Sequence, residues 1–494
     1  MGKIKNKIKI IFSSKELYIF LGITLIFFGI FSNMQYAPDT YAVFNNSLKT
    51  TVQHFFSCGR IVTGIFIGTI LGLFKLSTKS LYIISYFIAI ICSTFSMYKL
   101  YNITEKEIRN KCIRAIVSIL IVINIFSIEL FMYIEKGIMM LSVLLSILAV
   151  EQTKKTLEGN KKSSIKALIL MLLATCCYQG TVGIYVALSM IYIIKYSKNI
   201  MGFIKNNISV ALLYGIPAII NFIFVKFYFK NSRIKGDIVF NDSIAKIFKG
   251  TKDMFLGTYQ LFPKYLFITI LSILIIYIIY KIIIKKSDNK IKILEILGIF
   301  YIILGTTIVT VLPQMLQATN SIWFVARTSY PVASLIGILI IYAGMKIKTE
   351  QKENKLLLLS FIIFLIIQHI YFINFEIDNY KVNYQDMLIA KEISNKIEKY
   401  EKESGQVVNK LSVYNDMKPN YTYYNIHASG DMNIKAFSTE WSTKDIIKNY
   451  TNKNELNIVD KDEKIEKYFK EQDWETYNEK QIIIENETLH ICNY

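Results

Sequence analysis

Residues 266–280 read LFITILSILIIYIIY, fifteen positions without a charged side chain. This run lies within residues 264–284, a segment long enough to cross a hydrocarbon core of about 30 Å as a helix. Similar apolar runs recur along the chain from residue 18 to about residue 374. A chain with this pattern is expected to be an α-helical polytopic membrane protein.

The charge of the chain divides it into two parts. Residues 375–494 carry 16 lysines, no arginine and 22 acidic residues, a net charge of −6. Residues 1–374 carry 41 basic and 15 acidic residues, a net charge of +26. We therefore expect a transmembrane domain at 1–374 and a soluble domain at 375–494. Basic loops of a membrane protein reflect orientation, and without a recognition motif nucleic acid is not an expected partner.

The lysine clusters predict the orientation, because cytoplasmic loops are rich in Lys and Arg. They place the N-terminus in the cytoplasm and the C-terminal domain outside, with about eleven spans between them. The expected spans are 18–34, 80–99, 114–132, 138–152, 165–179, 182–196, 207–227, 264–284, 291–312, 328–345 and 355–374. Residues 60–75 form either a short further span or a helix lying at the interface in the first outer loop. The flat arrangement is favoured, because it keeps the basic residues of 99–114 in the cytoplasm.

The loop 228–262 fits this topology poorly. It is expected outside, yet it carries six basic residues against three aspartates. Either the order of the spans is wrong at this point, or the outer face attracts an anion.

The C-terminal part shows the pattern of a small α/β domain. Residues 386–403 have apolar side chains at helical spacing, at Ile389, Ile393 and Ile397 among others. Strands are expected at 411–414 and 456–459, helices at 442–450 and 461–469, and a hairpin at 481–485 and 488–492.

An acid and an arginine follow the first span. Asp39 lies in Tyr36-Ala37-Pro38-Asp39-Thr40-Tyr41, and Arg60 follows Gly59 about twenty residues later. A carboxylate in a partly dry cleft is suited to act as a general base, although Asp39 could also be an acid between interfacial aromatic residues. A guanidinium group can bind a phosphate through two hydrogen bonds, or extend to the lipid headgroups.

Four further candidates lie at the ends of expected spans. Glu135 is either a second acid or part of a Glu–Lys turn with Lys136. Tyr178 and Gln179 can hydrogen-bond sugar hydroxyls, or form a span end capped by Gly180. Arg327 follows a polar, aromatic loop and could bind the headgroup of a polyisoprenyl phosphate, or extend toward the interface.

The sequence gives no sign of a metal or cofactor. Six cysteines and four histidines show no metal-ligand spacing, and no GxSxG, HExxH or P-loop motif is present. No metal and no cofactor are therefore expected.

The pattern aromatic-x-Pro-Asp-x-Tyr after the first span, followed by Gly-Arg, resembles the glucosyltransferase II family of bacteria and their phages. These are membrane glycosyltransferases of the GT-C type that decorate O-antigen. The resemblance covers residues 1 to about 345, and Tyr178-Gln179 and Glu135 also fit its pattern. It implies a GT-C-like fold in a bacterial cytoplasmic membrane, Asp39 as catalytic base, and Arg60 as a support of the first outer loop. Arg327 would be a phosphate contact. Family members commonly have an acidic pair where this chain has Asp39 followed by Thr40.

The expected function is transfer of a hexose from a polyprenyl-phosphate sugar donor to a cell-surface glycan acceptor, and the resemblance implies that this hexose is glucose. Transfer would occur on the outer face of the membrane with inversion at the anomeric carbon.

Two alternatives to this function remain open. One is a polysaccharide polymerase or ligase that uses lipid-diphosphate oligosaccharides, in which Arg233 and Arg327 would matter more than Asp39. The other is a transporter or flippase for lipid-linked sugars.

Overall fold

The computed structural model describes residues 13–229, 239–347, 351–415, 426–428, 432–438, 440–451, 453, 456–472, 474 and 478–493. The chain divides into two compact units. The first unit comprises Met1–Ser32 and Val52–Phe372. The second comprises Asn33–Thr51 and Ile373–Tyr494.

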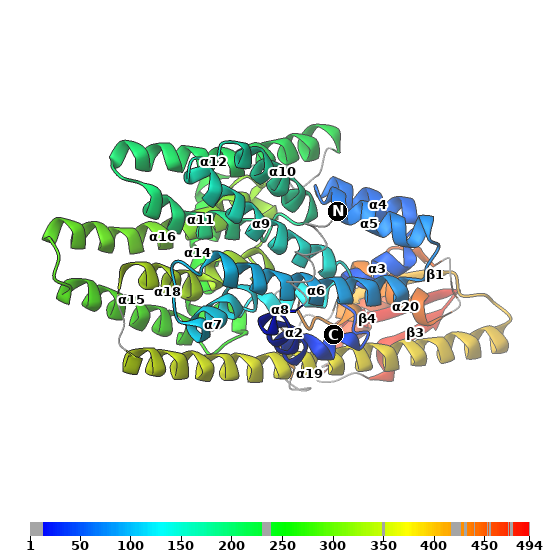
Figure 1. The fold of residues 1–494 in the computed structure, drawn as a ribbon. Coiled ribbons are helices and arrows are strands. Elements are labelled where there is room, and N and C mark those ends of the chain that lie inside the picture. Colours follow the sequence, from blue (N-terminus) through cyan, green and yellow to red (C-terminus); the bar gives the residue numbers. More distant parts are fainter. Residues whose placement is uncertain are drawn as a thin grey trace. The chain divides into compact units, whose positions relative to one another are not determined.

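Seven helices in the described part of the chain are long and apolar enough to cross a membrane. They are α2 (Lys15–Phe28, continued to Ser32), α6 (Thr78–Ile103), α9 (Lys136–Leu157), α12 (Ile200–Ile223, continued to Tyr228), α15 (Leu266–Ile284), α16 (Asn289–Met315) and α19 (Gln351–Ser404). Figure 1 shows α12, α15 and α16 with their axes roughly aligned. The protein is therefore a helical membrane protein.

Four of the expected spans correspond to helices that are shorter than these seven. Residues 114–132 form two helices, α7 (Lys111–Val122) and α8 (Ser127–Met132). The other three correspond to α10 (Lys162–Cys177), α11 (Gly183–Tyr196), and α17 (Tyr330–Ala333) followed by α18 (Leu335–Lys346). Residues 60–75 contain α5 (Ile61–Ile67) and a π-helical turn, Gly68–Leu73. The number of eleven spans, which exceeds the seven helices of spanning length, stays a prediction.

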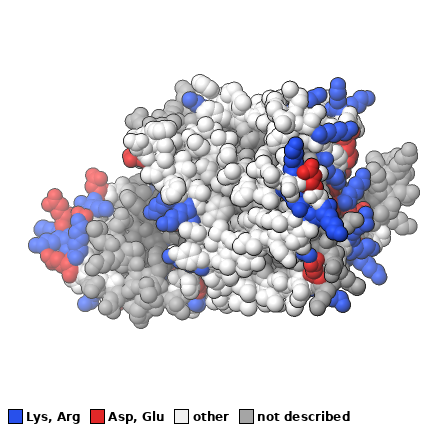
Figure 2. All heavy atoms as spheres, turned by 90° about the vertical axis from the view of Figure 1, so that its left-hand side faces the viewer, with Lys and Arg blue, Asp and Glu red and all other residues white. Residues whose placement is uncertain are grey.

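The long helices of the first unit present apolar side chains to their surroundings. On α12, Ile208, Leu212 and Ile219 are exposed, and on α16 the same is true of Leu304 and Ile308. Figure 2 shows a broad uncharged surface adjoining groups of Lys and Arg side chains. Large exposed apolar surfaces are rare on soluble monomers, so lipid is the environment that the exposed side chains of α12 and α16 fit.

Basic residues near the ends of α9 and α11 are held by a buried acid. The carboxylate oxygen Oε1 of Glu107 lies 3.3 Å from Nζ of Lys154 and 2.6 Å from Nζ of Lys195. Lys154 also donates a hydrogen bond of 2.8 Å to the carbonyl oxygen of Ile103. This network connects α6, α9 and α11 at one end of the unit.

The second unit contains a four-stranded sheet in the order β2-β1-β4-β3. The strands are β1 (Lys410–Asn415), β2 (Asn457–Ile458), β3 (Ile482–Glu485) and β4 (Thr488–Asn493). β1 is parallel to both β2 and β4, and β3 pairs with β4 as an antiparallel hairpin in which Glu485 faces Thr488. The expected strands are all present, and the expected helices correspond to α20 (Glu440–Tyr450) and α21 (Glu463–Glu471).

A segment near the N-terminus belongs to this second unit, which differs from the expected division at residues 374 and 375. The helix α3 (Pro38–Asn45) packs against α20. Nδ2 of Asn45 donates a hydrogen bond of 2.5 Å to the carbonyl oxygen of Asp445, and Lys448 donates one of 3.2 Å to that of Asn45. Tyr41 is buried in a core that also contains Ile393 of α19.

Candidate functional site

A cavity of about 270 Å³ lies in the first unit. Its lining comes from the residues before α5, the end of α10, the second halves of α12 and α16, and the segment that leads into α17. Four predicted site residues contribute to it: Arg60, Tyr178, Gln179 and Arg327. Because its lining combines apolar side chains with two arginines and several amides, it is suited to an amphiphilic anion.

Arg327 is held by an acid and a tyrosine. Its backbone N–H donates a hydrogen bond of 2.6 Å to Oε2 of Glu129, and its guanidinium group forms an ion pair with Oε1 of the same carboxylate. The guanidinium group also contacts the hydroxyl of Tyr133 and lies 4.4 Å from the centre of that ring. The Glu129 side chain is fully buried, and that of Arg327 is 12% exposed. Such charge-assisted contacts fix a guanidinium group in one orientation.

Arg60 is held in the same way by different residues. Its Nη1 lies 3.2 Å from Oε1 of Glu135, and its guanidinium carbon lies 4.7 Å from the centre of the Tyr178 ring. The Arg60 side chain is 19% exposed, and its Nε has no hydrogen-bond partner among the described residues. Stacking on an aromatic ring contributes about 0.5–2 kcal/mol, depending on how far the cation is desolvated.

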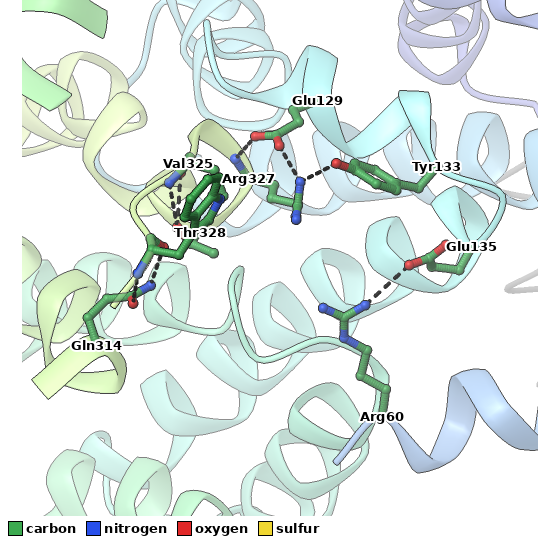
Figure 3. A network of polar contacts seen from close by, with 9 residues as sticks. Arg60, Glu129, Tyr133, Glu135, Gln314, Val325, Arg327 and Thr328 are labelled. Atoms are coloured by element: carbon green, nitrogen blue, oxygen red, sulfur yellow. Dashed lines mark hydrogen bonds and ion pairs between the residues drawn. The ribbon is translucent and has the colours of Figure 1, made fainter. Parts of the chain in front are cut away.

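The two arginines face one another. Figure 3 shows the guanidinium groups of Arg60 and Arg327 pointing toward the same space, with Glu129, Tyr133 and Glu135 around them. Each arginine is matched by one carboxylate, so the four side chains together carry no net charge. A guanidinium group carries five N–H donors in a planar fork. Such a fork is suited to bind a phosphate or another planar or tetrahedral anion.

The loop before Arg60 is fastened by two amides. Asn221 donates a hydrogen bond of 2.7 Å to the carbonyl oxygen of Gly59. Gln179 donates bonds of 3.1 Å to the carbonyl oxygen of Cys58 and to Oδ1 of Asn221. Gly59 has a φ of +74°, and a Cβ at this position would lie 2.5 Å from Oδ1 of Asn221. These contacts explain why a glycine precedes Arg60. Glycine adopts the positive φ of this turn and allows the side chains of Asn221 and Gln179 to approach the backbone closely.

The opposite wall is fastened by another amide. Gln314 of α16 donates a hydrogen bond of 2.9 Å to the carbonyl oxygen of Trp323 and accepts one of 3.1 Å from its N–H. In the turn that follows, Thr328 donates a hydrogen bond of 2.9 Å to the carbonyl oxygen of Val325. These bonds, drawn in Figure 3, hold the segment that carries Arg327.

The structure places the other predicted residues as follows. Asp39 is exposed in the first turn of α3 and belongs to the second unit. Glu135 pairs with Arg60, while Nζ of Lys136 lies 3.7 Å from the centre of the Tyr82 ring. Glu135 therefore forms a long-range ion pair with Arg60.

The basic loop 228–262 lies partly outside the described residues, including Lys230, Arg233 and Lys235. Lys246 belongs to α14 (Phe240–Lys252) and donates a hydrogen bond of 3.0 Å to the carbonyl oxygen of Thr319.

Two important residues were missed in the sequence. Glu129 lies inside the expected span 114–132, and Asn221 lies inside 207–227. A polar or ionised side chain within an apolar span is by itself a sign of a functional or structural contact. Glu129 and Asn221 are both polar residues within apolar spans, so the sequence could have identified them as candidates. It could not have predicted which residues they contact.

Among the described residues, no group of three or more His, Cys, Asp or Glu side chains could hold a metal ion. Comparison of the chain with protein-family models, with curated proteins and with solved structures finds no match.

Proposed function

We propose that the protein is an integral membrane glycosyltransferase that takes a hexose from a polyprenyl-phosphate sugar. The observation that carries this proposal is the pair of facing arginines, each backed by a glutamate and a tyrosine, in a cavity with apolar walls. A polyprenyl-phosphate sugar combines an apolar chain, an anionic phosphate and a polar ring. The apolar walls, the arginines and the amides of the cavity offer one partner to each of these parts.

The proposed reaction is a displacement with inversion. The general base is assigned to Asp39 from the sequence alone, since Asp39 belongs to the second unit and does not line the cavity. In this role Asp39 takes the proton of an acceptor hydroxyl on a cell-surface glycan. The hydroxyl oxygen attacks the anomeric carbon as the bond between that carbon and the phosphate oxygen breaks. Polyprenyl phosphate leaves with the electron pair. Arg60 and Arg327 stabilise the negative charge that develops on this leaving group.

The test is a transfer assay on membranes that contain the full-length protein. A radiolabelled polyprenyl-phosphate hexose is supplied, and label is followed from the lipid into a water-soluble glycan. We expect the unaltered protein to transfer label and the Asp39→Asn variant to lose most of this activity. Undiminished transfer by Asp39→Asn would refute Asp39 as the base. Absence of transfer by the unaltered protein, with any hexose donor, would refute the proposed function.

One observation also favours the polymerase or ligase alternative. Two guanidinium groups that point into one space are suited to the two phosphates of a lipid-diphosphate donor. The two functions differ in their dependence on Asp39. A polymerase or ligase would lose activity in Arg327→Gln and keep it in Asp39→Asn, and it would use the diphosphate donor in preference to the monophosphate.

A further inference from the structure

The cavity has a long wall formed by two helices. α12 contributes Tyr214, Ala218, Phe222 and Val225, which lie on one face because they follow each other at intervals of three or four residues. The facing wall is the second half of α16 and the residue after its end, including Leu312 and Leu316.

These two helices are in contact before they reach the cavity. The hydroxyl of Tyr301 on α16 lies 2.5 Å from Oδ1 of Asn207 on α12, and the rings of Phe203 and Tyr301 lie 5.2 Å apart. Further along both helices, side chains from each line the cavity. The two helices are thus joined at one level and have the cavity between them at the next.

Both helices contain a proline at the level of the cavity. Pro217 lies inside α12, and Pro313 lies inside α16 and lines the cavity. A proline within a helix removes one backbone hydrogen bond and bends or loosens the helix there. On α12 a π-helical turn follows at Phe224–Tyr228, another departure from regular helix that is frequent at functional sites.

The mouth of the cavity is apolar. Leu312, Leu316 and Trp323 line the cavity and are nevertheless 38%, 52% and 56% exposed. A side chain that lines a cavity and is also exposed lies at its opening. The surface beside this opening carries the exposed apolar residues Leu304 and Ile308 of α16. In a membrane protein, such a surface contacts hydrocarbon.

We propose that the opening between α12 and α16 is a lateral portal in which the hydrocarbon chain of an amphiphilic phosphate lies, while its headgroup reaches the arginines. An ion alone does not match the apolar mouth, and a neutral lipid does not match the positive charge of the two facing guanidinium groups. An amphiphile with an anionic headgroup matches both. The assignment of a phosphate headgroup rests on the proposed function. The position of the hydrocarbon chain is inferred from the apolar side chains at the mouth of the cavity.

Photo-crosslinking tests the portal in the full-length protein. A benzophenone amino acid replaces Leu312 in one variant and Leu304 in another, each in lipid nanodiscs. Both leucines are exposed on α16, and Leu304 does not line the cavity, so it is the matched control. The probe is radiolabelled polyprenyl phosphate at low mole fraction, with radiolabelled polyprenol of the same length as the comparison. A third variant carries the benzophenone at Leu316, in case the substitution at Leu312 disturbs the structure or gives no crosslink.

We expect Leu312 and Leu316 to be labelled several-fold more strongly than Leu304, with competition by unlabelled polyprenyl phosphate and weaker labelling by polyprenol. Equal labelling at all three positions, or labelling that ignores the phosphate, would overturn the portal because it reports contact with bulk lipid only. Sugar transfer without labelling at the mouth would overturn the portal and leave the proposed function standing. Specific labelling without sugar transfer would leave the portal standing and refute the function.

Discussion

The side chain of Asn221 donates a hydrogen bond of 2.7 Å to the carbonyl oxygen of Gly59, 162 residues away in the chain. This bond connects a membrane helix to the loop that presents Arg60. A helix wall of the cavity and one of its two cationic groups are therefore mechanically linked.

Gly59→Ala should displace this loop. Alanine in a left-handed conformation costs about 1–2 kcal/mol, and a Cβ within 3 Å of Asn221 and Gln179 adds about 1–3 kcal/mol of overpacking. Gly159→Ala is the control for a positive φ without crowding, because Gly159 has a φ of +107° and no atom lies within 4 Å of a Cβ placed there. We expect Gly59→Ala to lower the thermal unfolding midpoint in detergent more than Gly159→Ala does. Equal midpoints would contradict the prediction that crowding at Gly59 adds to the cost of the substitution.

Removing Glu129 should destabilise the first unit more than removing Glu135. Glu129→Gln leaves the guanidinium group of Arg327 deep in the protein without its carboxylate, a change that costs about 3–5 kcal/mol. The Arg60–Glu135 pair is somewhat more exposed, so Glu135→Gln should cost less. The free energy of unfolding in mixed micelles measures both. A double variant, Glu129→Gln with Arg327→Gln, should cost less than the sum of the two single changes, because it removes both charges.

Asp39→Asn should reduce sugar transfer by about 10²–10⁴-fold, the usual contribution of a general base. The stability of the protein should change little, since Asp39 is exposed in the first turn of α3. Asp242→Asn provides the control, because Asp242 is also an exposed acid in the first turn of a helix. A loss of transfer in both variants would show that the effect is not specific to Asp39.

The sheet of the second unit should weaken as the pH falls below about 6.5. Burial lowers the pKa of His490 from its ordinary value of 6.5, an effect that the carboxylates of Asp462 and Glu485 partly oppose. The unfolded chain then binds more protons than the folded chain in this range, so the stabilisation present above pH 6.5 is lost on acidification. Hydrogen exchange of the β1 and β4 amides, corrected for the intrinsic rates, should report this loss. His490→Gln should flatten the dependence, and an unchanged slope would contradict it.

The orientation can be tested with cysteines. Cys112 is exposed at the start of α7 and is expected in the cytoplasm, whereas Ser404 is exposed at the end of α19 and is expected outside. A membrane-impermeant maleimide should label Ser404→Cys in intact cells, and label Cys112 only after permeabilisation. The reverse pattern would invert the topology.

Local sequence features predicted the helices and strands well, because each depends on neighbours along the chain. The apolar runs at 207–227, 264–284 and 291–312 correspond to α12, α15 and α16, since the length of a run sets the length of a helix. The hairpin expected at 481–485 and 488–492 corresponds to β3 and β4. The prediction of one long span at 114–132 was wrong, because the helix breaks between α7 and α8. Asn124 lies in this break and donates a hydrogen bond to the carbonyl oxygen of the distant residue Tyr330.

The sequence predicted only part of the candidate site, because the contacts within the site join residues that are far apart in the chain. Arg60 was identified from the Gly-Arg pair in the first outer loop, and Tyr178, Gln179 and Arg327 from their positions at span ends. All four line one cavity. The partner of Arg327 lies 198 residues away and that of Arg60 lies 75 residues away. No periodicity within one segment encodes such a pairing. Only the fold brings the partners together.

The packing of α3 against α20 has a consequence for how this protein is made. Tyr41 leaves the ribosome hundreds of residues before Ile446 and Ile491, with which it shares a buried cluster. The nascent chain must therefore keep residues 33–51 available until synthesis is nearly complete. A gene fragment that starts at residue 373 would lack one side of its own interior. The shortest polypeptide expected to fold by itself would join 33–51 to 373–494 through a flexible tether.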